Sequence, residues 1–142
     1  LFVENEKTDI AGFCVLGGIF SEGIDLRGDA LIGVAVVGTG IPMVCRQRNI
    51  LRDYFDSHGK NGYQYAYVYP GMNKVLQAAG RVIRTKEDHG VILLLDERFR
   101  QREYSNLFPV EWNDRKTCTL SNVEAQLQKF WESIPDKISH KL

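Results

Sequence analysis

Two arginines and a glutamine lie close together in the stretch QAAGRVIRTKEDHG, residues 77–90. In a helix, Gln77, Arg81 and Arg84 occupy positions i, i+4 and i+7 and share one face. A guanidinium group is planar and always charged, and it can bind two phosphate oxygens at once. A pair of such groups can stabilise the charge that develops during phosphoryl transfer. The stretch is therefore a candidate phosphate-binding surface.

Gly80 interrupts the helical pattern beside these three residues, where glycine costs about 1 kcal/mol relative to alanine. Because glycine has no side chain, another group can approach the helix backbone there. An apolar stripe formed by Leu76, Ala79 and Ile83 occupies a separate face. A solvated helix face that happens to carry two arginines is the alternative, and on periodicity alone it is the more common meaning of this pattern.

A second stretch, GGIFSEGIDLRGD at residues 17–29, follows an apolar run directly. In open α/β sheets, ligand-binding loops lie beyond the carboxyl ends of the strands. Glycines allow tight turns in this stretch, a serine offers a hydroxyl group, and carboxylates could hold a ribose hydroxyl or an arginine. The candidate residues are Ser21, Glu22, Gly23 and Asp25. A glycine-rich connector with helix-capping residues is the alternative.

Three apolar runs and two helical patterns would have to position these residues. The runs at 12–16, 31–37 and 90–95 are continuous, which favours strands buried on both faces of a parallel sheet. Helical patterns at about 43–57 and 72–84 lie between the second and third runs. This alternation predicts an α/β layered domain. We expect residues 17–29 and 77–90 to lie on the same edge, beyond the carboxyl ends of the strands.

The end of the chain has a different pattern. Ser121 and Glu124 have the spacing of a capping box, which predicts a helix from Ser121 to about Ser133. We expect one domain over residues 1–142, with 101–142 as a C-terminal extension. The chain begins at Leu1, so we expect it to be a fragment of a longer protein.

The composition excludes several classes of protein. Basic and acidic side chains number 18 each, so a strongly basic nucleic-acid module is excluded and any contact with DNA must come from a local patch. The cysteines, Cys14, Cys45 and Cys118, form no C-x-x-C pair, which argues against a zinc or iron–sulfur motif and favours a reducing, cytoplasmic setting. Cys14 lies in an apolar run and is expected in the core. No apolar run is long enough for a transmembrane helix.

Together, G-G-x-F-S-E-G-I-D and Q-A-A-G-R-V-I-R-T-K-x-D-x-G resemble motifs V and VI of superfamily 2 helicases. The most similar branch is the XPD/DinG family, and within it the bacterial DinG-type helicases. The resemblance extends to GVAVVGTGIP at 33–42, RNILRDYF at 48–55 and VILLLDERF at 91–99, and it spans residues 11–100. The final forty residues resemble that family's C-terminal extension only loosely.

The resemblance implies a second helicase motor domain, a three-layer RecA-like α/β fold with a mainly parallel sheet. ATP would bind between this domain and a first motor domain of the same chain, and hydrolysis would drive translocation on single-stranded DNA. Arg81 and Arg84 match the arginine fingers, and we expect both to be largely exposed, because burial of unpaired guanidinium groups is costly. The other matching positions are Gln77, Gly80, Gly23 and Asp25 for ATP, and Ser21 and Glu22 for DNA binding or coupling.

The sequence contains no G-x-x-x-x-G-K-[ST] loop and no D-E-A-H-type box. The resemblance therefore implies that ATP and Mg²⁺ serve the full-length protein, that the Mg²⁺ ligands lie outside this chain, and that the isolated chain binds neither and is inactive. The expected partners are single-stranded DNA, or a duplex with a single-stranded tail, and the first motor domain. No membrane partner is expected.

Two other functions compete with the helicase hypothesis. The stretch VAVVGTGIPM, residues 34–43, looks like a strand followed by the G-x-G of a dinucleotide site, but Met43 stands where the third glycine belongs and Pro42 intrudes. A non-catalytic α/β module for protein interaction or nucleotide binding is the other alternative. The presence of Gln77, Arg81 and Arg84 counts against it.

Four tyrosines alternate in GYQYAYVYP, at positions 63, 65, 67 and 69. This period of two predicts an extended segment or short strand with its tyrosines packed on one face. A stacking surface for single-stranded DNA is the alternative.

Overall fold

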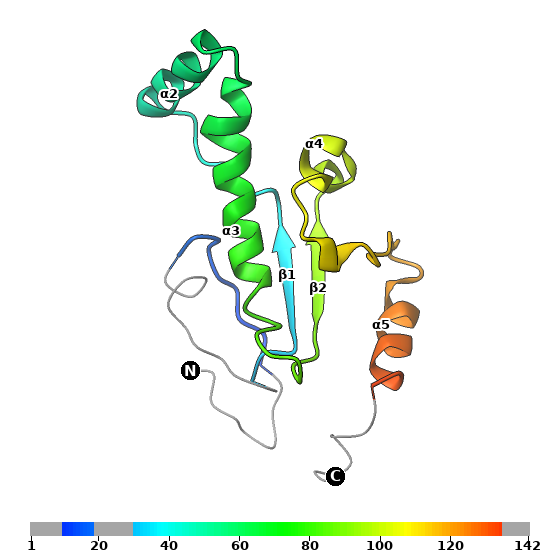
Figure 1. The fold of residues 1–142 in the computed structure, drawn as a ribbon. Coiled ribbons are helices and arrows are strands. Elements are labelled where there is room, and N and C mark those ends of the chain that lie inside the picture. Colours follow the sequence, from blue (N-terminus) through cyan, green and yellow to red (C-terminus); the bar gives the residue numbers. More distant parts are fainter. Residues whose placement is uncertain (1–9, 19–29, 135–142) are drawn as a thin grey trace. The chain divides into compact units, whose positions relative to one another are not determined.

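Two parallel strands, β1 (Gly33–Val37) and β2 (Val91–Leu95), lie side by side in the computed structural model, which describes residues 10–18 and 30–134 (Figure 1). Gly33 pairs with Val91 at one end of the ladder and Val37 with Leu95 at the other. The second and third apolar runs therefore form strands, and their parallel pairing is confirmed. Both strands belong to one compact unit, Gly12–Phe108.

The first apolar run, residues 12–16, does not form a strand in the structure. Phe13 is 99% exposed, Val15 is 80% exposed and Cys14 is also exposed. The predictions of a strand and of a core cysteine at these positions are wrong. A run of apolar residues becomes a strand only where a neighbouring strand pairs with its backbone. Within the part of the chain that the structure describes, β1 and β2 pair with each other.

Helix α3 (Tyr69–Ala79) packs against β1 (Figure 1). Its apolar face contributes Met72, Val75 and Ala78 to the core. Two short helices after β2, η3 (Glu97–Arg100) and α4 (Arg102–Ser105), each contribute one aromatic core residue. The buried core residues are Val36, Val68, Met72, Val75, Ala78, Phe99 and Tyr104. At the carboxyl ends of the strands, Val37 and Leu95 are 78% and 52% exposed, so the expected burial on both faces is wrong for these positions.

The helical segment that ends in α3 begins much earlier than its pattern predicted. Residues 62–63 are already helical, and a π-helix, η2 (Gln64–Val68), leads directly into α3. The four tyrosines therefore lie on a helix, and the prediction of an extended segment is wrong. Their rings are engaged with other aromatic rings: Phe55 stacks on Tyr65 with centroids 4.2 Å apart, and Tyr63 stacks on Tyr67 at 5.3 Å.

Pro70 lies in the first turn of α3, directly after the π-helix. Proline has no backbone N–H, so it cannot donate to the carbonyl oxygen of Ala66 four residues earlier. The N–H of Tyr69 donates to Gln64, five residues earlier, which is the π-helical pattern. Arg48, on helix α2 (Arg46–Ser57), donates from Nη1 to the Ala66 oxygen at 2.7 Å. An arginine from the neighbouring helix thus bonds the carbonyl that Pro70 cannot reach.

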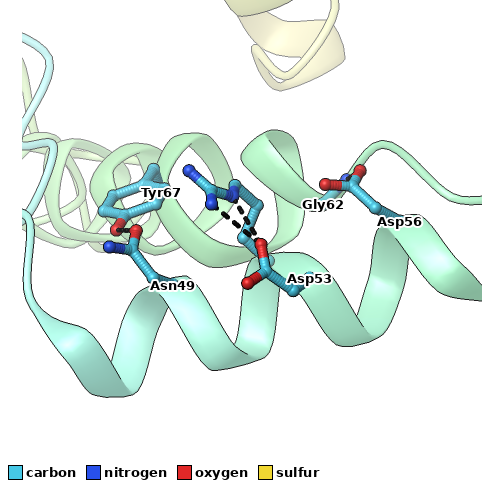
Figure 2. Close-up of polar contacts among 6 residues, drawn as sticks. Asn49, Asp53, Asp56, Gly62 and Tyr67 are labelled. Atoms are coloured by element: carbon cyan, nitrogen blue, oxygen red, sulfur yellow. Dashed lines mark hydrogen bonds and ion pairs between the residues drawn. The ribbon is translucent and has the colours of Figure 1, made fainter.

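Other polar contacts join α2 to the same helical segment (Figure 2). The hydroxyl of Tyr67 donates to Asn49 Oδ1 at 2.8 Å, and the N–H of Gly62 donates to Asp56 Oδ1 at 2.8 Å. A Cβ atom at Gly62 would overlap the carbonyl oxygen of Arg52, so glycine allows the two backbones to approach here. Helix α2 has no buried residue, and directed hydrogen bonds therefore fix its position more than burial does.

The loop after β1 touches α3 backbone to backbone. A Cβ atom at Gly40 would lie 2.6 Å from the carbonyl oxygen of Gly71, and one at Gly71 would lie 2.7 Å from the carbonyl oxygen of Thr39. Gly40 also has a φ of +66°, which favours glycine. The glycines of the G-T-G sequence therefore serve turns and close packing against α3, which accounts for them without a dinucleotide.

A second compact unit includes residues 10–11 and 109–134 of the described part. It contains a short helix, η4 (Val110–Trp112), and helix α5 (Val123–Glu132). The predicted C-terminal helix is confirmed, but the capping box is wrong because Asn122 is the N-cap. Asn122 Oδ1 accepts instead from the N–H of Thr119 at 2.8 Å, which closes the turn before the helix. A single domain over residues 1–142 stays a prediction.

Replacing Gly71 with alanine is expected to destabilise the fold. Within a helix this change normally stabilises by about 0.5–1 kcal/mol. Here the new Cβ would lie 2.7 Å from Thr39 O and 2.9 Å from Ile41 N, and backbone atoms cannot rotate away. We expect a net loss of about 1–3 kcal/mol in urea unfolding followed by circular dichroism. The exposed Asn73 of the same helix provides the control, because Asn73→Ala should be neutral or slightly stabilising. A Gly71→Ala variant as stable as the original chain would contradict this packing.

Replacing Arg48 with alanine would leave the carbonyl of Ala66 without its side-chain donor. We expect a loss of about 1–3 kcal/mol in the free energy of unfolding. Arg46 is exposed on the same helix, and Arg46→Ala should change that free energy by less than about 0.5 kcal/mol. Equal losses in the two variants would show that the bond to Ala66 contributes nothing specific.

Candidate functional site

The helix that was expected to carry Gln77, Arg81 and Arg84 ends before the two arginines. Helix α3 stops at Ala79, and Gly80 is its C-cap. The N–H groups of Arg81 and Val82 donate to Ala78 and Ala79, three residues back, at 3.2 and 3.1 Å. Such bonds tighten the last turn and end the helix. Arg81 therefore lies in a turn and Arg84 in the following loop, so the prediction of one shared helix face is wrong.

Gly80 is at the end of the helix rather than in its middle. Its φ of −66° and ψ of −4° are accessible to any residue, and its N–H still donates to the Leu76 oxygen at 2.8 Å. The mid-helix cost of glycine therefore does not arise. Gly80 is exposed, and an added Cβ would meet the carbonyl oxygens of Leu76 and Gln77 at 3.2 and 3.8 Å. The helix end remains open to approach by another group.

The two arginines differ from Gln77 in exposure. Gln77 is exposed on the last turn of α3, whereas Arg81 and Arg84 are partly buried, and both make contacts within the structure. The prediction that both guanidinium groups are largely exposed is therefore wrong. The chain turns back toward the sheet after the helix and is anchored there by Val82, which is 3% exposed.

Residues 80–90 lie beside the amino ends of the strands. A Cβ atom at Gly90 would overlap Val82 and lie 2.9 Å from the carbonyl oxygen of Ile32, and Val91 N–H donates to the same oxygen at 3.0 Å. The expectation that this stretch lies beyond the carboxyl ends is wrong. A helix that connects two parallel strands must return the chain to the amino end of the sheet.

The second candidate stretch is described only at its start. Gly17 has a φ of +82°, and an added Cβ would lie 3.1 Å from the Lys74 side chain on α3. Gly18 N–H donates to Val15 at 3.0 Å and closes the turn. The remaining candidates, Ser21, Glu22, Gly23 and Asp25, lie outside the described residues. Their roles in binding ATP or DNA stay predictions.

Asp88 belongs to the motif at residues 77–90 but was not among the residues predicted for the site. Its Oδ2 accepts hydrogen bonds from the backbone N–H groups of Arg84 at 2.9 Å and Thr85 at 2.8 Å. These bonds, with that from Arg84 the stronger influence, hold the pKa of the Asp88 carboxyl below its ordinary value of 3.8. Thr85 and Asp88 have the S/T-x-x-D/E spacing of a capping box, in which the later acidic side chain reaches back to the N–H of the first residue, and this was the available signal.

Neither a metal cluster nor a membrane-spanning helix occurs in the described ranges. Residues 10–18 and 30–134 contain no group of three or more His, Cys, Asp or Glu side chains that could hold a metal ion. No helix within these ranges combines the length and the apolar character that crossing a bilayer requires.

The pH dependence of the loop around Arg84 follows from the lowered pKa of Asp88. Because the pKa of this carboxyl is lower in the folded state, its hydrogen bonds stabilise the fold at pH values above the ordinary pKa of 3.8. This stabilisation is lost as the pH falls through the lower pKa of the folded state. In NMR spectra, the amide signals of Arg84 and Thr85 should titrate with a midpoint below 3.8. Asp88→Asn should abolish this titration and Glu87→Gln should preserve it. A midpoint at or above 3.8 would contradict the assignment.

Comparison with known proteins identifies the family. The helicase C-terminal domain family matches residues 1–115. A probable ATP-dependent helicase of Methanocaldococcus jannaschii is 31% identical over 99 residues, covering 63% of this chain and 15% of that protein. The ATP-dependent DNA helicase DinG of Photobacterium profundum is 35% identical over 89 residues, covering 61% of the chain and 13% of that protein.

A third relative connects the chain to the eukaryotic branch. The general transcription and DNA repair factor IIH helicase subunit XPD of Dictyostelium discoideum is 31% identical over 102 residues, covering 69% of the chain and 13% of that protein. The chain thus spans less than a sixth of the length of each of these relatives. The predicted membership of the XPD/DinG helicase family is confirmed. The chain belongs to the helicase C-terminal domain family, as the C-terminal domain of an XPD/DinG-family helicase.

Proposed function

We propose that the chain is the second, RecA-like motor domain of an ATP-dependent DNA helicase, and that Arg81 and Arg84 act as arginine fingers. The ATP would be bound mainly by the first motor domain, and the two arginines would contact its phosphates across the interdomain cleft. The observation that carries the proposal is that Arg81, in the turn after α3, and Arg84, in the loop that continues it, directly follow the exposed end of this helix in a chain of this family.

Their placement after a helix C-terminus suits cationic side chains. The last carbonyl groups of α3 carry a partial negative charge, which favours guanidinium groups nearby. A planar guanidinium can contact two phosphate oxygens, and its charge is most useful when negative charge develops on the transferring phosphoryl group. Because Arg81 lies in a turn and Arg84 in a loop, the two side chains could approach one phosphate from different directions.

The remaining candidate residues would contact ATP or DNA. Gln77 and Gly80, with Gly23 and Asp25, would contact ATP, and Ser21 and Glu22 would connect the nucleotide to single-stranded DNA. Mg²⁺ and the β- and γ-phosphates would be held by the first motor domain. The isolated chain would therefore not turn over ATP, whether or not single-stranded DNA is present.

The arginine-finger role predicts a specific kinetic defect in the full-length protein. Arg84→Ala should lower kcat for DNA-stimulated ATP hydrolysis on the order of 10³-fold. The partly buried side chain should contribute only about 1 kcal/mol or less to the free energy of unfolding. Arg84→Lys should restore kcat only partly, because an ammonium group keeps the charge but loses the planar fork. Steady-state ATPase rates and melting temperatures of the same preparations test this.

Lys86 provides the matched control, since it is an exposed cation in the same loop. Lys86→Ala should leave kcat within about 2-fold of the original value. The arginine-finger role would be refuted by an Arg84→Ala variant that unfolds more readily but whose folded fraction keeps its specific activity.

A further inference from the structure

The loop that carries Arg84 is fixed at both of its ends. Val82 anchors the start of the loop in the core with 3% of its surface exposed. At the other end, Gly90 lies against Val82 and the carbonyl of Ile32 so closely that a Cβ atom would overlap Val82. Residues 83–89 thus span a short distance between two fixed points. The direction in which Arg84 leaves the backbone depends on what holds this span.

The carboxylate of Asp88 bonds the span internally. One oxygen, Oδ2, accepts from both Arg84 N–H (2.9 Å) and Thr85 N–H (2.8 Å). Thr85 Oγ1 accepts from Glu87 N–H at 3.3 Å, and Asp88 N–H donates to the Thr85 carbonyl at 3.4 Å. Hydrogen bonds to an ionised carboxylate are about twice as strong as bonds between neutral groups. The backbone amide of Arg84 is therefore held by the strongest kind of bond in this loop.

We propose that Asp88 is a positioning residue for Arg84: its carboxylate fixes the backbone from which the Arg84 guanidinium reaches the phosphates of ATP. This inference rests on the proposed arginine-finger role. Asp88 itself touches backbone amides and takes no direct part in phosphoryl transfer. Its contribution arises because a displacement of about 1 Å at a reacting centre can lower a rate 10²-fold.

A double-mutant cycle in the full-length protein separates this role from simple stabilisation of the loop. Arg84→Ala removes the guanidinium group but keeps the backbone N–H that Asp88 binds. If Asp88 acts through the Arg84 side chain, Asp88→Ala should lower kcat about 10- to 100-fold in the original protein. In the Arg84→Ala background the same change should lower kcat less than about 2-fold, because residues that act as a unit are not additive.

Two further variants keep the test sound if Asp88→Ala folds poorly. Asp88→Asn keeps an oxygen acceptor of nearly the same shape but loses the charge, so its kcat should fall between those of the original protein and Asp88→Ala. Glu87→Gln removes the same charge from the neighbouring exposed residue and should leave kcat within about 2-fold. Melting temperatures of all variants are measured on the same preparations.

The outcomes distinguish this inference from the proposed function. Equal fold-losses from Asp88→Ala in the two backgrounds would overturn the positioning role while leaving Arg84 as a finger, and so would an unchanged kcat in the original background. The positioning role would also be overturned if the decrease in kcat in Asp88→Ala and Asp88→Asn simply paralleled the decrease in their melting temperatures. If Arg84→Ala alone has no effect on kcat, the arginine-finger role fails first, and Asp88 has no catalytic side chain to position.

Discussion

The backbone contact between α3 and the loop after β1 sets the geometry on which the rest of the larger unit depends. Gly40 and Gly71 bring the helix and the loop closer than any side chain would allow. At this separation the apolar face of α3, with Met72 and Val75, packs against Val36 of β1 in a common core. The helix must then run back along the sheet and end near the amino end of β2. That end point places Arg81 and Arg84.

A different kind of interaction holds the first part of the helical segment. Pro70 lacks the N–H that would bond the carbonyl of Ala66 in a regular α-helix, and Arg48 donates to this carbonyl instead. Hydrogen bonds to Asn49 and Asp56 add to this contact, whereas α2 contributes no buried residue. Directed polar bonds tolerate little displacement, so they define the position of a helix that burial alone would leave poorly specified.

The candidate site depends on both kinds of constraint. The core anchors Val82, close packing fixes Gly90, and the Asp88 carboxylate bonds the span between them. Arginine fingers need a defined direction as well as a charge, because their effect depends on where charge develops in the transition state. A loop with fixed ends and a charged internal acceptor can supply that direction without extending the helix through the arginines.

Residue type and short-range spacing were enough to predict the two parallel strands, the existence of three helices and the family. These features depend on apolar runs and on motifs whose residues are neighbours in the chain. The end of α3 at Ala79, the helical tyrosines and the exposure of residues 13–15 depended on partners far away in the sequence. The tertiary structure also decided the role of Asp88, because only the folded loop brings its carboxylate to the amide of Arg84. Periodicity describes what a segment can bury, but the hydrogen bonds and close contacts that end a helix or close a loop exist only once the chain is folded.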